Sequence, residues 1–146
     1  MDVSQIFECQ MCGICCEGKG GIVVNTSDLE RIANYLKLEP SKVIDLYGEY
    51  EGTKLKLRHN QAGNCIFFDK GKGCAIHEVK PSVCKAWPFF RGNLVDPISL
   101  ALAKEFCPGI KRDVSFQDFS RIGAEYLQGE KLIAQNAETE ANALII

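Results

Sequence analysis

The chain has 146 residues, a formal net charge of −2 and a pI near 5.7, with 46% hydrophobic and 25% charged residues. This length suits one domain, and the composition excludes disordered, collagen-like and low-complexity classes. Lysines and arginines are scattered, so no basic stripe for nucleic acid is expected. No apolar run reaches the roughly eighteen residues of a membrane span, and Met1–Glu8 lacks the pattern of a secretion signal. We expect one cytoplasmic domain over 1–146 that binds neither nucleic acid nor membrane.

The first half of the chain divides into short elements at its glycines and prolines. Ser27 and Glu30 stand at capping-box distance, and the lysine–leucine alternation of 54–57 is typical of a half-buried strand. A turn then returns the chain, so that Cys65 and Cys74 are expected to face each other across a hairpin. The expected elements are a cysteine-rich loop at 7–16, a turn at 18–21, a strand at 22–24, helices from Thr26 or Ser27 to about Leu38 and from Pro40 to about Tyr50, strands at 53–58 and 65–68, and a turn at 69–73.

Prolines set most boundaries in the second half. The expected elements are a short helix between Pro81 and Pro88 that carries Cys84, a helix from Asp96–Pro97 to Phe106 ending at Cys107, and a last helix from Ser115 to about Ala134, followed by a tail expected to fray. These elements predict an α+β fold, with short helices around a small antiparallel hairpin. The cysteine-rich loops are expected to converge on a metal centre, within a motif core over about 7–108.

Eight cysteines are far above ordinary usage, yet too few for a secreted scaffold held by disulfides. In a reducing cytosol, clustered cysteines are metal ligands or redox groups more often than structural disulfides. Cys9, Cys12 and Cys15 follow one another at two-residue intervals, a spacing at which thiolates grip one ion and which opens the bacterial ferredoxin motif. The last cysteine of that motif precedes a proline, and here only Cys107 does. We therefore expect Cys9, Cys12, Cys15 and Cys107 to bind one centre.

The other cysteines are assigned to a second centre or a supporting role. Cys15 and Cys16 are adjacent, and their side chains should project in opposite directions on an extended segment. All eight are candidate metal ligands: Cys9, Cys12, Cys15, Cys16, Cys65, Cys74, Cys84 and Cys107. The alternative that the four later ones are buried small hydrophobic residues stays open.

Other side chains near the cysteines have two interpretations each. His77 and His59 are interpreted as incidental, although His77 follows Cys74 at a ligand-like spacing. The aromatic residues Trp87, Phe89 and Phe90 could shield a cluster from solvent or simply form core.

The cysteine segments resemble the YkgJ-like cysteine-cluster family, which is named for its CxxCxxCC motif and is described as zinc- or iron-chelating. The segments that fit are Cys9–Cys16, Gly63–Phe67, Gly73–His77 and Lys80–Pro88, within about Phe7 to Cys107. The chain departs at His77, where tyrosine is typical, and at Lys80, where arginine is usual. The resemblance implies a metal centre and no particular reaction. A similar pattern in flagellin lysine methylase suggests an accessory role in protein modification.

Three functions fit these observations. The first is a metal-binding protein holding zinc or an iron–sulfur cluster, with 4Fe–4S favoured among clusters, for redox chemistry or electron transfer. The second is an enzyme or accessory factor in protein modification that uses the cluster or a remaining thiol. The third is a metallochaperone or a metal or redox sensor. The partners expected are the metal or cluster and a redox or modification partner protein. The sequence contains no phosphate loop, dinucleotide fingerprint or serine triad, so catalytic residues are left unassigned.

Overall fold

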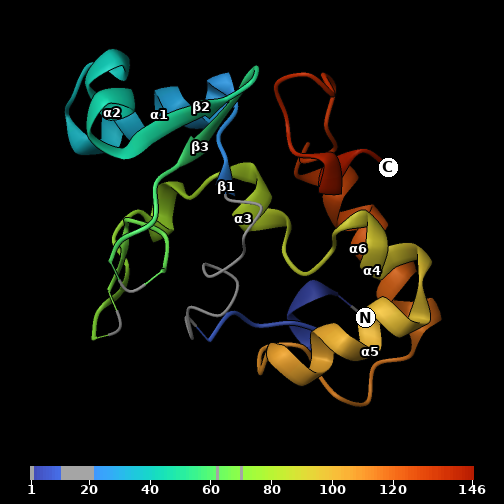
Figure 1. The fold of residues 1–146 in the computed structure, drawn as a ribbon. Helices are drawn as coiled ribbons and strands as arrows, with labels where there is room; N and C mark the ends of the chain where they lie inside the picture. The colour runs from blue at the N-terminus through green and yellow to red at the C-terminus, as the bar shows by residue number, and fades with distance from the viewer. Residues whose placement is uncertain (1, 11–21, 62, 70) are drawn as a thin grey trace.

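Helices and small antiparallel sheets build the chain, which agrees with the predicted α+β class (Figure 1). The computed structural model describes residues 2–10, 22–61, 63–69 and 71–146. The helices are α1 (Thr26–Leu36), α2 (Pro40–Tyr47), α3 (Ser82–Ala86), α4 (Arg91–Val95), α5 (Pro97–Phe106), α6 (Phe116–Gly129) and the 3₁₀ turns η1 (Val3–Gln5), η3 (His77–Val79) and η4 (Asn142–Leu144). The strands are β1 (Ile22–Val23), β2 (Gly48–Glu51), β3 (Lys54–Leu57), β4 (Phe68–Asp69) and β5 (Gly73–Cys74).

The first half forms a three-stranded antiparallel sheet in the order β1-β3-β2, with α1 and α2 beside it. Strand β3 buries Leu55 and Leu57 and leaves the two intervening lysines half-buried, which confirms the predicted alternation. The helix expected to run from Pro40 to about Tyr50 is shorter than predicted. Helix α2 ends at Tyr47, and Gly48 is already extended as the first residue of β2. A Cβ at Gly48 would lie 2.9 Å from the Leu55 Cδ1 atom, so a larger residue there would displace the end of this leucine side chain.

Helix α1 begins at Thr26, one of the two expected starts, and ends at Leu36, but its N-cap and capping box differ from those expected. Asn25 is the N-cap, and its side chain accepts a hydrogen bond from the Asp28 amide at 2.7 Å. The Asp28 carboxylate accepts one from the Asn25 amide at 3.1 Å. The expected capping box of Ser27 and Glu30 is therefore wrong. Asparagine is as good an N-cap as serine, and Asn25 stands two residues before Ser27.

The second half packs α4, α5 and α6 together with the N-terminal turn η1. Helix α5 has the predicted bounds, and Ser115 caps α6 by accepting from the Asp118 amide at 3.1 Å. Helix α4 was not predicted, and α6 ends at Gly129 rather than near residue 134. The tail does not fray in this structure, because Leu132 and Leu144 are buried in the same core.

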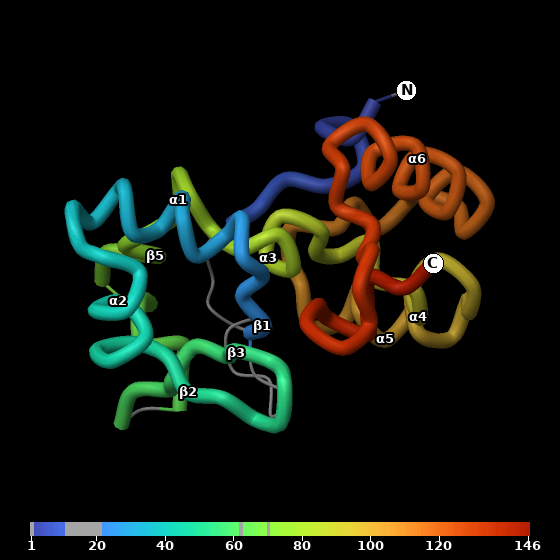
Figure 2. Tube along the Cα trace, turned by 90° about the horizontal axis from the view of Figure 1, so that it is seen from above, coloured from blue at the N-terminus to red at the C-terminus, as the bar shows by residue number. Residues whose placement is uncertain are grey.

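Two hydrophobic clusters form the core. One combines the sheet with α1 and α2, and the other combines the N-terminal segment with α4, α5, α6 and the tail. Figure 2 shows the two groups side by side with α3 between them. Val83 on α3 packs against both clusters, so this short helix joins the two halves. That the whole chain is a single domain stays a prediction.

Within the described ranges, no helix combines the length and the apolar character that crossing a bilayer would require.

Candidate metal centre

The described part of the chain contains five of the eight predicted ligands: Cys9, Cys65, Cys74, Cys84 and Cys107. Outside it lie Cys12, Cys15 and Cys16. Within the described ranges, no three cysteine, histidine, aspartate or glutamate side chains are grouped closely enough to hold a metal ion. The complete ligand set therefore stays a prediction, and the structure shows how the segments that carry the other five are arranged.

The segment that leads into the cysteine motif pairs with the segment after α5. Phe7 and Ile110 form an antiparallel bridge, and the Glu8 amide donates to the Gly109 carbonyl at 2.9 Å. Gly109 is buried, and a Cβ there would clash with the Glu8 carbonyl oxygen and lie 2.9 Å from the Phe7 ring. Glycine thus permits the two backbones to approach this closely.

This bridge places two predicted ligands of one centre on paired segments. Cys9 is exposed and follows the bridge by two residues, and Cys107 precedes it by three on the opposing segment.

Cys107 caps the end of α5 and is buried in the second cluster, with 8% of its surface exposed. The indole N–H of Trp87 donates a hydrogen bond to its sulfur, with 3.4 Å between the two heavy atoms. Trp87 lies just after α3 and packs edge-on against Phe90, with ring centres 5.2 Å apart. From the sequence, these aromatic residues were expected either to shield a cluster or to form core, and the hydrogen bond was not predicted, since spacing does not show which ring nitrogen meets a sulfur.

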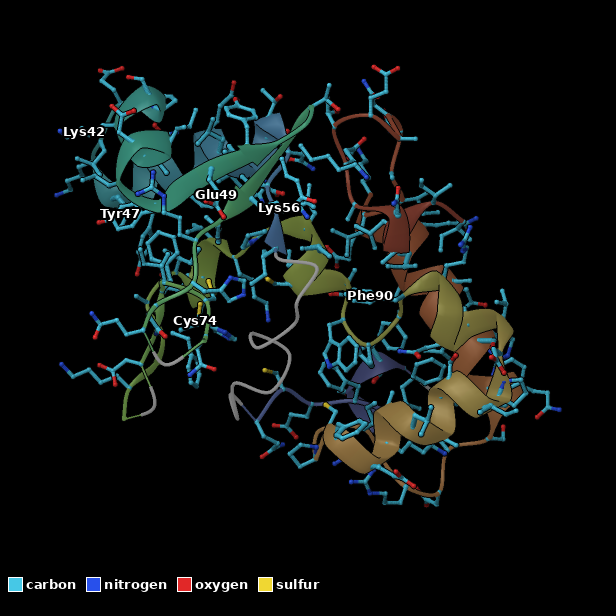
Figure 3. The ribbon with its side chains drawn as sticks, in the orientation of Figure 1. Lys42, Tyr47, Glu49, Lys56, Cys74 and Phe90 are labelled. Atoms are coloured by element: carbon cyan, nitrogen blue, oxygen red, sulfur yellow. The ribbon has the colours of Figure 1, made fainter. Side chains whose placement is uncertain are left out.

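The other three described cysteines belong to the first cluster. Cys65 is buried in it, and Cys74 and Cys84 pack against it from β5 and α3. Figure 3 shows Cys74 on the sheet side of the molecule and Phe90 on the side of α4 and α6. The predicted hairpin exists, but its register differs: Cys74 pairs with Phe68, and Cys65 forms a bridge with His59. The expected pairing of Cys65 with Cys74 is therefore wrong, because the strand begins only at Phe68.

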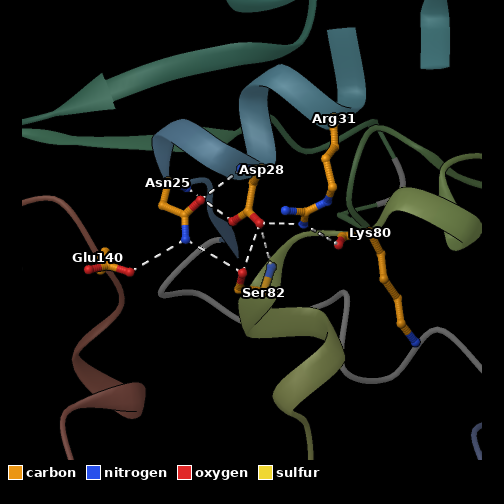
Figure 4. Close-up of polar contacts among 6 residues, drawn as sticks. All are labelled: Asn25, Asp28, Arg31, Lys80, Ser82 and Glu140. Atoms are coloured by element: carbon orange, nitrogen blue, oxygen red, sulfur yellow. Dashed lines mark hydrogen bonds and ion pairs between the residues drawn. The ribbon is translucent and has the colours of Figure 1, made fainter. Parts of the chain in front are cut away.

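A buried polar network fixes α3, the helix that carries Cys84 (Figure 4). The Asp28 side chain is 1% exposed and its Oδ1 atom accepts from Arg31 at 2.6 Å, from the Ser82 amide at 3.0 Å and from the Ser82 hydroxyl at 2.8 Å. Because Ser82 is the first residue of α3, this one carboxylate binds the starts of two helices together. The sequence does not predict this link, because local spacing carries no signal for a contact 54 residues away.

The two histidines differ in their surroundings. His77 is half-buried in η3, and burial together with the nearby Lys80 charge lowers its pKa. The neutral imidazole that this favours is the form able to bind a metal. His59 is exposed and forms the bridge to Cys65.

A pocket of about 310 Å³ opens between the start of α1, the start of α3 and the tail. Arg31, Lys85 and Lys131 line it, together with Glu130 and Glu140. Among the described residues, no cysteine or histidine lines this pocket.

Comparison with known proteins follows the cysteine pattern. Residues 8–108 match a family model described as "CxxCxxCC: Putative zinc- or iron-chelating domain". Two proteins of Methanocaldococcus jannaschii are similar to the chain. "Uncharacterized protein MJ0661" is 33% identical over 84 residues, which are 57% of this chain and 44% of that protein. "Uncharacterized protein MJ0939" is 32% identical over 113 residues, 73% of this chain and 37% of that protein.

The chain therefore spans less than half the length of either relative. No solved structure matches it.

Proposed function

Since the chain belongs to the CxxCxxCC family of zinc- or iron-chelating domains, we propose that its clustered cysteines bind zinc or an iron–sulfur cluster. The observation that carries the proposal is the pairing of Phe7 with Ile110, which joins the start of the motif to the segment beginning at Cys107. Among clusters, 4Fe–4S is favoured, because three cysteines at two-residue intervals with a remote cysteine before proline match the ferredoxin arrangement.

The donor set suits such a centre. Thiolates are the preferred ligands of both zinc and iron–sulfur clusters. Cys65 and Cys107 are buried among apolar side chains, and an apolar shell limits the access of solvent to a metal site. A bound zinc ion would crosslink the segments, whereas a cluster would also supply one-electron transfer.

We propose two groups of ligands. The first is Cys9, Cys12, Cys15 and Cys107, and the second is Cys16, Cys65, Cys74 and Cys84. The core supports this division, because Cys107 belongs to one hydrophobic cluster and the described members of the second group belong to the other. The adjacent Cys15 and Cys16 would then serve different centres, because neighbouring side chains on an extended segment are expected to point in opposite directions.

The biological role proposed is redox chemistry or electron transfer with a protein partner in the cytoplasm. A reducing cytosol keeps the thiols available for ligation. Both relatives are named as uncharacterized proteins, and each is more than twice as long as its matched region. The activity of a longer protein would therefore be built around this domain.

Cysteine variants test the grouping. The full chain is prepared without oxygen, stripped of metal and titrated with Zn²⁺ against a coloured chelator. Wild type should bind two equivalents, and Cys107→Ser and Cys84→Ser should each lose one, with the loss adding in the double variant. A wild type that binds one equivalent, or a single variant that loses all binding, would show one shared centre. A wild type that binds no zinc, and no iron on reconstitution with iron and sulfide, would refute the proposed function.

A further inference from the structure

The hydrogen bond from Trp87 to Cys107 is a specific feature of the proposed centre. The chain has a single tryptophan, and its indole nitrogen lies 3.4 Å from the sulfur of a buried cysteine. Indole is a donor only, and a neutral thiol is a weak acceptor. A thiolate is a much stronger one, because a hydrogen bond to a charged acceptor is roughly twice as strong.

Separate elements hold the donor and the acceptor. The Trp87 amide donates to the Val83 carbonyl at 3.3 Å, which ties the indole to α3. The Cys107 amide donates to the Ala103 carbonyl at 2.9 Å, which ties the sulfur to α5. The hydrogen bond therefore spans two helices that approach from different parts of the chain, 20 residues apart.

The segment after the tryptophan is also fixed. Asn93 is 8% exposed, and its side-chain amide donates to the Pro88 carbonyl at 2.8 Å. The Phe89 ring is buried against Phe119, with ring centres 5.0 Å apart. The indole thus emerges from a backbone anchored on both sides, which is what a group that orients a metal ligand requires.

We propose that Trp87 is a positioning residue for the metal centre that contains Cys107: its N–H fixes the orientation of the sulfur. The inference rests on the proposed function. A donor at the sulfur also draws electron density away from the metal, and such hydrogen bonds are known to raise the potential of cysteine-ligated clusters.

Co²⁺ is a suitable probe, because its thiolate complexes absorb through sulfur-to-metal charge transfer. Trp87→Phe removes the N–H and retains an aromatic ring, and Phe90→Leu changes the neighbouring ring without touching a donor. With the metal-free full chain loaded anaerobically, Trp87→Phe should shift part of the charge-transfer absorption to longer wavelength, because the sulfur becomes a better electron donor. Phe90→Leu should leave the band in place.

The fluorescence of the single tryptophan gives a second measurement that needs no variant at Trp87. Co²⁺ next to the Cys107 sulfur should quench it strongly in wild type and leave most of it in Cys107→Ser. Co²⁺ that binds with thiolate absorption but does not quench Trp87 would overturn the inference and leave the proposed function standing. An unshifted band in a folded Trp87→Phe protein would also overturn it. If no Co²⁺ binds at all, the inference fails, and zinc titration and iron–sulfide reconstitution decide the proposed function separately.

Discussion

The Asp28 carboxylate is the clearest case of one residue that sets the relation between distant elements. It is buried and bonded to Arg31 and to the first residue of α3. Asp118 has the same place in α6 and also pairs with an arginine three residues on, but its side chain is 40% exposed. The two carboxylates therefore share a helix position and an arginine partner, but they differ in burial and in the capping box that Asp28 completes with Asn25.

Asp28→Asn should lower the free energy of unfolding by about 2–3 kcal/mol, because it leaves a guanidinium without its charged partner and weakens the bonds to Ser82. Asp118→Asn should cost at most about 1 kcal/mol, as exposed ion pairs do. Urea unfolding of both variants measures the difference. Equal losses would mean that the link between α1 and α3 contributes nothing beyond helix capping.

Gly109 is a second residue whose role is invisible in the sequence. Gly109→Ala should force Phe7 and Glu8 away from the segment after α5, at a cost of about 1–3 kcal/mol for the overpacked contact. Because Cys9 and Cys107 lie on the two displaced segments, zinc affinity at the first proposed centre should also fall. Chelator competition measures it. Gly129→Ala is the control, since a Cβ there has no atom within 4 Å. Wild-type affinity in Gly109→Ala would contradict a role for the pairing in the centre.

At the scale of elements, α6 holds the end of α3 through one side chain. The Tyr126 hydroxyl donates to the Lys85 carbonyl at 3.2 Å, next to Cys84. Burial, and to a lesser extent the Glu130 charge, raises the Tyr126 pKa above its ordinary value of 10.0. The folded protein therefore holds this proton more tightly than the unfolded chain does.

The stability that this tyrosine contributes is complete below about pH 10 and is lost as the pH rises through its folded pKa. Urea midpoints between about pH 9 and about pH 11 should fall more steeply in wild type than in Tyr126→Phe. Tyr35→Phe, at a residue that is 43% exposed, should follow wild type. A Tyr126→Phe protein with the wild-type slope would show that the hydroxyl does not couple α6 to α3 in this way.

Element types with strong local signals are predicted well. Three signals each act over a few neighbouring residues: the alternation in β3, the proline at the start of α5 and the serine cap of α6. Strand β2 was missed because it begins at a glycine, a residue that is not typical of strands. Helix α4 was missed because neither a side-chain cap nor a clear hydrophobic period marks its five residues. The register of the hairpin depends on where β4 begins, which tertiary packing decides.

At the scale of the whole molecule, two hydrophobic clusters meet at α3, and four of the five described cysteines lie in or against one of them: Cys107 in one, and Cys65, Cys74 and Cys84 in the other. Thiol spacing in the sequence predicts that a centre exists, and family membership agrees with zinc or iron chelation. Spacing alone also proposes the group of Cys9, Cys12, Cys15 and Cys107, and the pairing of Phe7 with Ile110 adds support because it joins the segments that carry Cys9 and Cys107.

The most direct test of cysteine-ligated metal binding is the analysis of metal and acid-labile sulfide in the full chain purified without oxygen. The account predicts bound zinc or bound iron, with sulfide and charge-transfer absorption near about 400 nm accompanying iron. Two zinc ions per chain, or iron and sulfide in the ratio of a cluster, would agree with the proposed ligand groups. Folded protein that contains neither metal, and that takes up neither on reconstitution, would contradict it.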